Sequence, residues 1–267
     1  MGNGADVEFF EFENNQLAYR RFGDGADTLL AFHGFGQTGQ VFAALQRPLG
    51  ERYTILAIDL FFHGQSSYHT SQRLSKSDWA RLVDAFLEVQ QVNRFSLVGF
   101  SLGGRFALTT VETFAPRIDQ LILIAPDGIT RNVWYWVATG SPAGRWLFRH
   151  LLTHLPVLNA VGHGLTRVGL LNRTIMRFVE ISLSTPQQRE LVYVSWTQFR
   201  LIKPDLNRIR NLLSQYPVRV RFFTGAFDRI VPGRYIIPLT KQLHHYELTV
   251  FRTGHNHLIE LTGDQLK

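Results

Sequence analysis

Short apolar runs alternate with helical patterns over the first half of the chain. Five apolar runs are predicted as strands, and the first of them is expected in an antiparallel hairpin: residues 17–20, 28–32, 54–58, 95–98 and 120–125. The spacing of apolar residues predicts an amphipathic helix at 78–89, with Ser77 as its N-cap. This alternation is typical of a mostly parallel sheet covered by helices on both faces, so the pattern predicts an α/β fold.

The pattern changes after Gly128. Residues 129–213 show basic helical patterns without strands and hold four of the five tryptophans. Strand patterns resume at 218–223 and 246–251, separated by a helix that begins near Pro232. The chain is therefore predicted to form a core from residues 1–128 and 214–267, with a helical insert at 129–213.

Composition excludes several kinds of chemistry. The 267 residues include no cysteine, so disulfides, thiolate nucleophiles and cysteine-bound metals are excluded. No H-E-x-x-H spacing, dinucleotide-binding glycine motif or Walker sequence occurs, and we expect neither a metal nor a nucleotide cofactor. The amino terminus lacks the features of a signal peptide, and no apolar run reaches the roughly 18 residues of a membrane span. We therefore expect a cytoplasmic protein.

The net charge of +7 originates in the insert. Residues 1–128, 129–213 and 214–267 carry −4, +8 and +3. This excess fits a solvated helical face, attraction of acidic substrates, or docking on an anionic membrane or nucleic acid. We favour the solvated face, because the arginines are scattered and no nucleic-acid-binding motif accompanies them. A membrane surface is the secondary hypothesis, since tryptophans and arginines share the same predicted helices.

The segment Gly99-Phe100-Ser101-Leu102-Gly103 lies where a predicted strand turns into a predicted helix. A serine in such a turn adopts a strained backbone that exposes its hydroxyl, and flanking glycines relieve the crowding. This is the setting of a nucleophile elbow. For the pentapeptide alone, an ordinary glycine-rich turn is the alternative.

A serine nucleophile needs a base, an acid that orients the base, and donors for the developing oxyanion. In α/β sheets, ligands gather beyond the carboxyl ends of the strands. Ser101, Asp228 and His255 each follow a predicted strand and are the candidates. Asp127 is an alternative acid after the preceding strand, and His257 is an alternative base.

Five segments resemble the motifs of the serine hydrolases with the α/β-hydrolase fold. They are HGFG at 33–36, DLFFHGQS at 59–66, GFSLG at 99–103, GAFDRIVP at 225–232 and GH at 254–255. The resemblance covers nearly the whole chain outside the insert, and the order serine, aspartate, histidine is that of this fold. The departure is the pair Phe61-Phe62, where members of the family usually carry proline and glycine.

The resemblance implies an α/β-hydrolase fold, with a mostly parallel sheet flanked by helices and an all-helical cap inserted after the sixth core strand. It implies that Ser101 is the nucleophile, His255 the base and Asp228 the acid. The backbone N–H groups of Phe35 and Leu102 would then form the oxyanion hole. His33 and His63 would brace loops rather than react.

The cap of this family roofs the active site, which gives the insert a predicted role in substrate binding. Its aromatic residues could line an apolar pocket or pack the cap helices together. The residues expected to contact substrate are apolar: Phe35, Phe100, Leu102, Trp134 and Ile230.

These features predict a cofactor-independent serine hydrolase that cleaves a carboxylic ester or thioester of a small, largely apolar substrate through an acyl-enzyme. The fold leaves alternatives open: a carbon–carbon bond hydrolase, a peptidase, a cofactor-free peroxidase-like enzyme, or a non-catalytic ligand receptor. The expected partner is the small substrate, and no nucleic acid is expected. The chain is expected to be a monomer or a homodimer.

Overall fold

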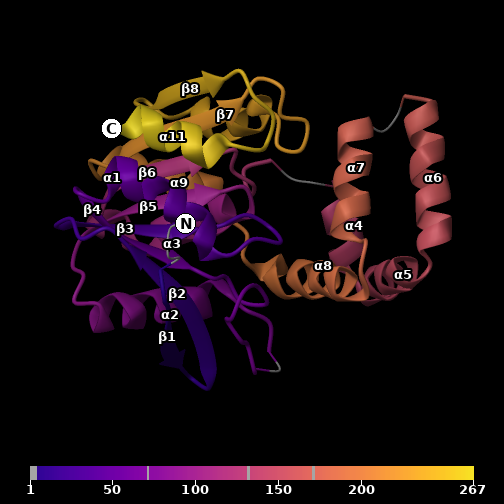
Figure 1. The fold of residues 1–267 in the computed structure, drawn as a ribbon, viewed down its shortest axis with the longest axis horizontal. Helices are drawn as coiled ribbons and strands as arrows, with labels where there is room; N and C mark the ends of the chain where they lie inside the picture. The colour runs from indigo at the N-terminus through magenta and orange to yellow at the C-terminus, as the bar shows by residue number, and fades with distance from the viewer. Residues whose placement is uncertain (1–4, 71, 131–132, 170–171) are drawn as a thin grey trace. The chain divides into compact units, whose positions relative to one another are not determined.

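The computed structural model describes residues 5–70, 72–130, 133–169 and 172–267. The strands form one eight-stranded sheet with the order β1-β2-β4-β3-β5-β6-β7-β8 (Figure 1). The antiparallel pairs are β1 with β2 and β2 with β4, and all other neighbours are parallel. The strands are β1 (Val7–Phe12), β2 (Asn15–Phe22), β3 (Asp27–Phe32), β4 (Tyr53–Ile58), β5 (Phe95–Phe100), β6 (Ile118–Ile124), β7 (Arg219–Gly225) and β8 (Glu247–Phe251). The predicted mostly parallel sheet is confirmed.

The register of the central strands brings their carboxyl ends to one edge of the sheet. Phe32 at the end of β3 lies opposite Ile58 of β4 and Gly99 of β5. All six residues of β5 are buried, as expected for a parallel strand covered on both faces. From β3 the chain continues to β4 on one side of it, and then crosses over to β5 on the other side. The point between β3 and β5 is therefore a topological switch point, and α/β proteins bind ligands at the carboxyl ends of the strands there.

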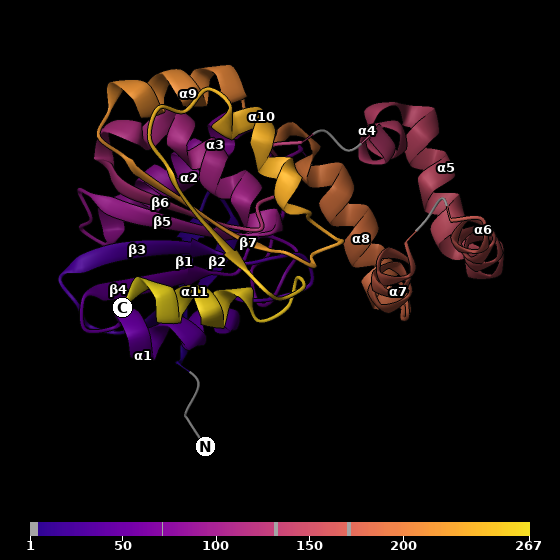
Figure 2. The ribbon, with the colours of Figure 1, turned by 90° about the horizontal axis from the view of Figure 1, so that it is seen from above.

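Helices cover both faces of this sheet (Figure 2). One layer contains η1 (Gly39–Leu45), α1 (Gln46–Leu49) and α11 (Leu258–Leu266), and the other contains α2 (Lys76–Val89), α3 (Leu102–Phe114) and α9 (Leu206–Gln215). The turns η2 (Ala115–Arg117) and η4 (Gly233–Ile236) and the short helix α10 (Ile237–Thr240) complete the connections. No helix of the described ranges has the length and apolar character needed to cross a membrane.

The start of α2 corrects the predicted N-cap. Helix α2 begins at Lys76 and Ser75, not Ser77, is its cap. The Ser75 hydroxyl accepts a hydrogen bond from the Asp78 N–H (3.1 Å), and the Asp78 carboxylate accepts one from the Ser75 N–H (3.0 Å). This reciprocal pair satisfies two backbone donors at once, which Ser77 cannot do because no acidic side chain lies three residues after it.

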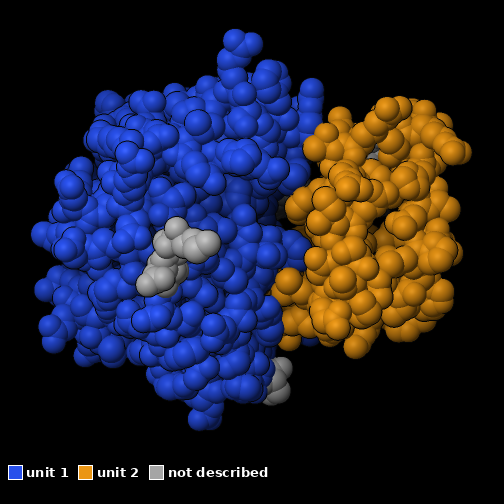
Figure 3. Space-filling view, viewed as in Figure 1, with its two compact units in different colours: residues 1–130, 202–267 blue, residues 131–201 orange. Residues whose placement is uncertain are grey.

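The chain divides into two compact units (Figure 3). Residues 1–130 and 202–267 form the core unit, and residues 131–201 form the helical unit, which follows β6. The predicted insert extends to residue 213, whereas α9 belongs to the core unit because it packs against α3. The helical unit contains α4 (Val133–Gly140), α5 (Pro142–Thr153), α6 (Leu155–Arg167), α7 (Arg173–Ser182), α8 (Pro186–Gln198) and η3 (Phe199–Leu201).

Aromatic side chains pack the helical unit together. The Phe148 ring lies 5.9 Å from the Tyr193 ring and 5.2 Å from the Trp196 ring. The Tyr135 hydroxyl donates a 3.0 Å hydrogen bond to the Trp196 carbonyl, and Phe199 is buried. These contacts join α4, α5 and α8, so these aromatic residues stabilise the helical unit itself.

Candidate active site

The turn between β5 and α3 holds Ser101 in an unusual backbone conformation. Its φ of 51° and ψ of −116° lie outside the regions that L-residues ordinarily adopt. The Ser101 N–H donates to the Ile124 carbonyl of β6 (3.0 Å), while the Ser101 carbonyl accepts from the N–H groups of Gly104 (2.9 Å) and Asp127 (2.8 Å). Hydrogen bonds from the neighbouring strand and its loop therefore hold the strained turn in place.

The glycines of this turn are required by close packing. A Cβ atom on Gly103 would lie 1.9 Å from the carbonyl oxygen of Phe32, and one on Gly99 would lie 2.6 Å from the carbonyl oxygen of Gly103. Both distances are shorter than van der Waals contact, and both atoms belong to the backbone. The glycine pattern that identified the turn in the sequence thus has a steric cause: α3 starts in direct contact with β3 and β5.

Asp228 and His255 form a hydrogen-bonded pair at the same edge of the sheet. The loop after β7 carries Asp228, and the loop after β8 carries His255. The His255 Nδ1 lies 2.6 Å from Asp228 Oδ2, and Asp228 Oδ1 accepts from the N–H groups of Ile230 (2.8 Å) and Val231 (2.9 Å). Since a carboxylate only accepts, His255 donates through Nδ1 and keeps Nε2 for another partner.

The alternative acid and base have other surroundings. Asp127 forms an ion pair with Arg105 of α3, and its side chain is partly exposed. His257 is exposed and serves as the N-cap residue of α11 with a φ of 61°. The carboxylate hydrogen-bonded to an imidazole at this edge is therefore that of Asp228, and the imidazole is that of His255.

Phe100 connects the histidine to the elbow. Its ring stacks on the His255 imidazole with 4.9 Å between ring centroids and an interplanar angle of 30°. Phe100 is the residue immediately before Ser101, and it is buried. This contact brings the loop after β8 against the turn after β5, so three segments distant in sequence meet at one edge of the sheet.

Two backbone N–H groups near Ser101 are candidates for an oxyanion hole. Leu102 is the first residue of α3, where N–H groups lack intrahelical partners and the helix dipole favours negative charge. Phe35 follows β3, the strand paired with β5. Within the described ranges, neither N–H has a hydrogen-bond partner. The Gln37 side chain accepts from the Gly34 N–H (3.1 Å) and stabilises the turn that carries Phe35.

The remaining predicted substrate residues differ in what the structure describes. Ile230 is half-buried and follows Asp228, to which its N–H donates. The side chain of Trp134, in α4, lies outside the described part of the structure. No cluster of three or more histidine or carboxylate side chains with metal-binding geometry occurs among the described residues.

Asp59, in the loop after β4, is the centre of a buried hydrogen-bond network that the sequence did not predict. The Asp59 carboxylate accepts hydrogen bonds from Arg20 Nη1 (2.9 Å), the Gly39 N–H (2.7 Å) and the Gln65 N–H (3.1 Å). Its side chain is fully buried, and that of Arg20 is 10% exposed. The DLFFHGQS motif pointed to this loop, but no local pattern around Arg20 indicates its partner. The ion pair fixes the loop after β4 against β2 and η1.

His33 connects this loop to the predicted oxyanion loop. Its Nε2 accepts a hydrogen bond from the Leu60 N–H (2.9 Å), and its Nδ1 lies 2.7 Å from the Gly34 carbonyl. Since a carbonyl only accepts, Nδ1 carries the proton and the ring is neutral. Complete burial, together with the nearby His63, lowers the pKa of His33 to about 3. Burial also lowers the pKa of His63.

We expect this neutral histidine to make stability fall with acidification. In the unfolded state His33 becomes protonated below its ordinary pKa of 6.5, whereas in the folded state it stays neutral until the pH reaches about 3. Stability associated with His33 is therefore complete above pH 6.5 and is lost toward pH 3, by about 1.4 kcal/mol per pH unit.

Urea unfolding at a series of pH values tests this expectation. The His33→Gln variant should show a slope shallower than that of the wild type by about 1.4 kcal/mol per pH unit. The matched variant His245→Gln, at an exposed histidine, should keep the wild-type slope. Equal slopes for the wild type and His33→Gln would contradict the assignment.

The family model described as the alpha/beta hydrolase fold matches residues 27–260. The chain belongs to the α/β-hydrolase family. The predicted α/β-hydrolase fold, with its helical region after the sixth strand, is thereby confirmed.

Curated relatives of this α/β hydrolase differ in how much they share with it. An uncharacterised protein of Mycobacterium tuberculosis is 32% identical over 127 residues, which are 48% of this chain and 37% of the relative. The chain thus matches well under half of that protein. The uncharacterised hydrolase YugF of Bacillus subtilis is 25% identical over 91% of this chain and 83% of the relative. A pimeloyl-[acyl-carrier protein] methyl ester esterase of Aliivibrio fischeri is 31% identical over 41% of this chain and 40% of the relative.

Solved structures share the fold of this hydrolase along nearly its whole length. A hydrolase from Pseudomonas aeruginosa has a TM-score of 0.67 at 18% identity, covering 99% of this chain and 97% of that chain. A meta-cleavage product hydrolase from Pseudomonas fluorescens has a TM-score of 0.65 at 19% identity, covering 95% and 92%. At these identities the likeness establishes the fold alone.

Proposed function

We propose that this α/β hydrolase is a serine hydrolase that cleaves a carboxylic ester or thioester through an acyl-enzyme. The observation that carries the proposal is the Asp228–His255 hydrogen bond of 2.6 Å, which lies against the strained turn of Ser101 through the Phe100 ring. A serine, a histidine and a buried carboxylate at the carboxyl ends of β5, β8 and β7 are the parts that nucleophilic catalysis requires.

In the proposed reaction, the Ser101 Oγ attacks the carbonyl carbon of the substrate while His255 Nε2 takes the hydroxyl proton. The tetrahedral intermediate collapses as the bond to the alcohol or thiol breaks, and His255 returns the proton to the leaving group. Water then attacks the acyl-enzyme with His255 again as base, which releases the acid and restores Ser101. Asp228 keeps the Nδ1 proton in place and stabilises the imidazolium.

The N–H groups of Phe35 and Leu102 are proposed to bind the oxyanion of each tetrahedral intermediate. Their positions after β3 and at the start of α3 support this role, because both flank the turn of Ser101. Donors of this kind stabilise the transition state more than the substrate, and one of them typically contributes about 3 kcal/mol.

The proposed substrate is small and largely apolar around the scissile bond. Apolar residues lie next to Ser101. Phe100 and Leu102 flank it in the sequence, and Phe35 follows β3, the strand that pairs with β5. The esterase among the relatives acts, by its name, on a methyl ester, which supports ester cleavage for this chain as well.

A fluorophosphonate probe tests the proposal directly, since it forms a covalent bond with an activated serine. We expect stoichiometric labelling of the wild type, mapped by mass spectrometry to Ser101, and no labelling of Ser101→Ala. The control Ser214→Ala, at an exposed serine of α9, should label like the wild type. Equal labelling of Ser101→Ala, or no labelling of folded wild-type protein, would refute the serine mechanism.

A panel of p-nitrophenyl esters and acyl thioesters of increasing chain length would then separate an esterase from a thioesterase. Labelling of Ser101 without turnover of either series would favour the carbon–carbon bond hydrolase, peptidase, peroxidase-like or receptor alternatives. The probe and the panel thus test the nucleophile and the substrate separately.

A further inference from the structure

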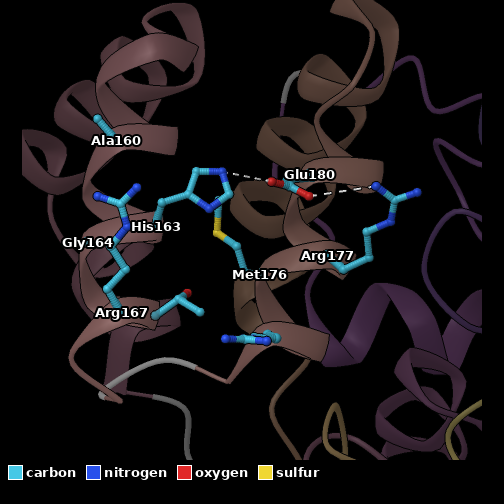
Figure 4. A pocket seen from close by; sticks show the side chains of 9 residues that line it. Ala160, His163, Gly164, Arg167, Met176, Arg177 and Glu180 are labelled. Atoms are coloured by element: carbon cyan, nitrogen blue, oxygen red, sulfur yellow. Dashed lines mark ion pairs between the residues drawn. The ribbon is translucent and has the colours of Figure 1, made fainter.

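Helices α6 and α7 of the helical unit form the walls of an open cavity of about 740 Å³ (Figure 4). Its lining includes the charged or titratable side chains of His163, Arg167, Arg173, Arg177 and Glu180, together with Met176. Glu180 lies 3.2 Å from His163 Nε2 and 3.9 Å from Arg177 Nη1. It is the one carboxylate among the lining residues, against three guanidinium groups. The cavity therefore carries excess positive charge.

The other arginines of the described helical unit are engaged in its internal structure. Arg145 and Arg200 donate to the Thr139 carbonyl at 2.9 and 2.8 Å. Arg189 donates to the Leu183 carbonyl (3.2 Å), and the Arg149 guanidinium lies 5.1 Å from the centre of the Tyr193 ring.

Two of the three arginines of the cavity have no such role. Neither Arg167 nor Arg173 forms an ion pair with a described residue. Residues 131–201 contain eight arginines, two glutamates, and no lysine or aspartate. The positive charge of α6 and α7 is therefore available to an external anion.

An exposed apolar stripe runs along α6. The stripe consists of Val157, Val161 and Leu165, together with Val168, the residue that caps the carboxyl end of α6. Their spacings of four, four and three residues place them on one face of the helix. Their exposed fractions are 55%, 55%, 40% and 68%. A contiguous exposed apolar patch of this kind marks an interaction site.

Neighbouring helices of the same unit also expose large apolar side chains. Ile181 of α7 is 53% exposed, and Trp136 and Trp146, on α4 and α5, are 70% and 69% exposed. Tryptophan is enriched where a protein surface meets the boundary between headgroups and acyl chains.

We propose that the α6–α7 hairpin docks on an anionic phospholipid surface. Arg167, Arg173 and Arg177 bind lipid phosphates, and the α6 stripe inserts into the headgroup and acyl boundary. Arginine matches phosphate geometry through its planar set of donors, and apolar and basic groups on one amphipathic element are the combination that interfacial helices use. A second copy of the chain is a poorer occupant, because a symmetric contact through this hairpin would bring like charges together.

Vesicle co-sedimentation tests the proposal, with the Ser101→Ala chain run in parallel so that the result is independent of hydrolysis. We expect the wild type and Ser101→Ala to bind vesicles of phosphatidylcholine and phosphatidylglycerol, and to bind pure phosphatidylcholine vesicles far less. Each basic residue near an anionic surface contributes roughly a five-fold factor, so the triple variant R167Q/R173Q/R177Q should bind about 100-fold more weakly. The control Arg47→Gln, at an exposed arginine of the core unit, should bind like the wild type.

The apolar part is tested with V161S/L165S, whose exposed positions make misfolding unexpected. This variant should bind more weakly at every salt concentration, while Val89→Ser on α2 should bind like the wild type. Circular dichroism and melting temperature verify the fold of each variant. Equal binding to neutral and anionic vesicles, unchanged binding by the triple variant, or Arg-dependent binding of inorganic phosphate without vesicle binding would overturn the proposal. A change in oligomeric state without a change in vesicle binding would overturn it too.

Discussion

Asp228→Asn should lower kcat for an ester substrate by about 10⁴-fold while leaving the protein folded. The Asp228 carboxylate accepts the His255 Nδ1 proton at 2.6 Å and is held by the N–H groups of Ile230 and Val231. An amide at this position can present its NH₂ group to Nδ1, which moves the imidazole proton to Nε2. His255 could then no longer accept the proton of Ser101, and the imidazolium would lose its counter-charge.

Steady-state kinetics with a p-nitrophenyl ester measure this effect. Asp127→Asn is the matched control, because Asp127 also lies at a strand end but pairs with Arg105 rather than with a histidine. We expect that control to retain kcat within about 10-fold of the wild type, since it removes none of the three proposed catalytic residues. A large loss of kcat in Asp127→Asn, together with a small loss of kcat in Asp228→Asn, would identify Asp127 rather than Asp228 as the acid.

Asp59→Asn should reduce the free energy of unfolding by about 3–5 kcal/mol. The carboxylate is fully buried, and Arg20 Nη1 lies 2.9 Å away with 10% of its side chain exposed. Removing the negative charge leaves a buried guanidinium without compensation. Since domains of this kind are stable by only about 5–15 kcal/mol, the loss is a large part of the total.

Urea unfolding compares this variant with Asp27→Asn. Asp27 pairs with Arg52 at 3.2 Å, but both side chains are more than half exposed, so that loss should stay below about 1 kcal/mol. The double variant R20M/D59N should recover part of the stability, because it no longer buries an unpaired charge. Equal losses in Asp59→Asn and Asp27→Asn would show that burial does not control the strength of this pair.

Local patterns were sufficient for most of the sheet. The predicted runs at 28–32, 54–58 and 95–98 all fall within β3, β4 and β5, because a parallel strand covered on both faces is apolar at nearly every position. The cap of α2 was misplaced by two residues, since Ser75 and Ser77 are both good caps and the reciprocal bonds with Asp78 decide between them. The end of the insert was also misplaced, because α9 is helical in either case and only its packing on α3 assigns it to the core unit.

The sequence by itself determined the α/β class, the strained turn at Ser101, and the short set of acids and bases at strand ends. It could do so because strand periodicity, glycine spacing and turn chemistry act over a few residues. Tertiary structure alone decided that Asp228 faces His255, that Arg20 neutralises Asp59, and that three arginines line the cavity of α6 and α7. Those pairs join residues far apart along the chain, and the strength of a charge depends on its burial, which only the folded chain creates.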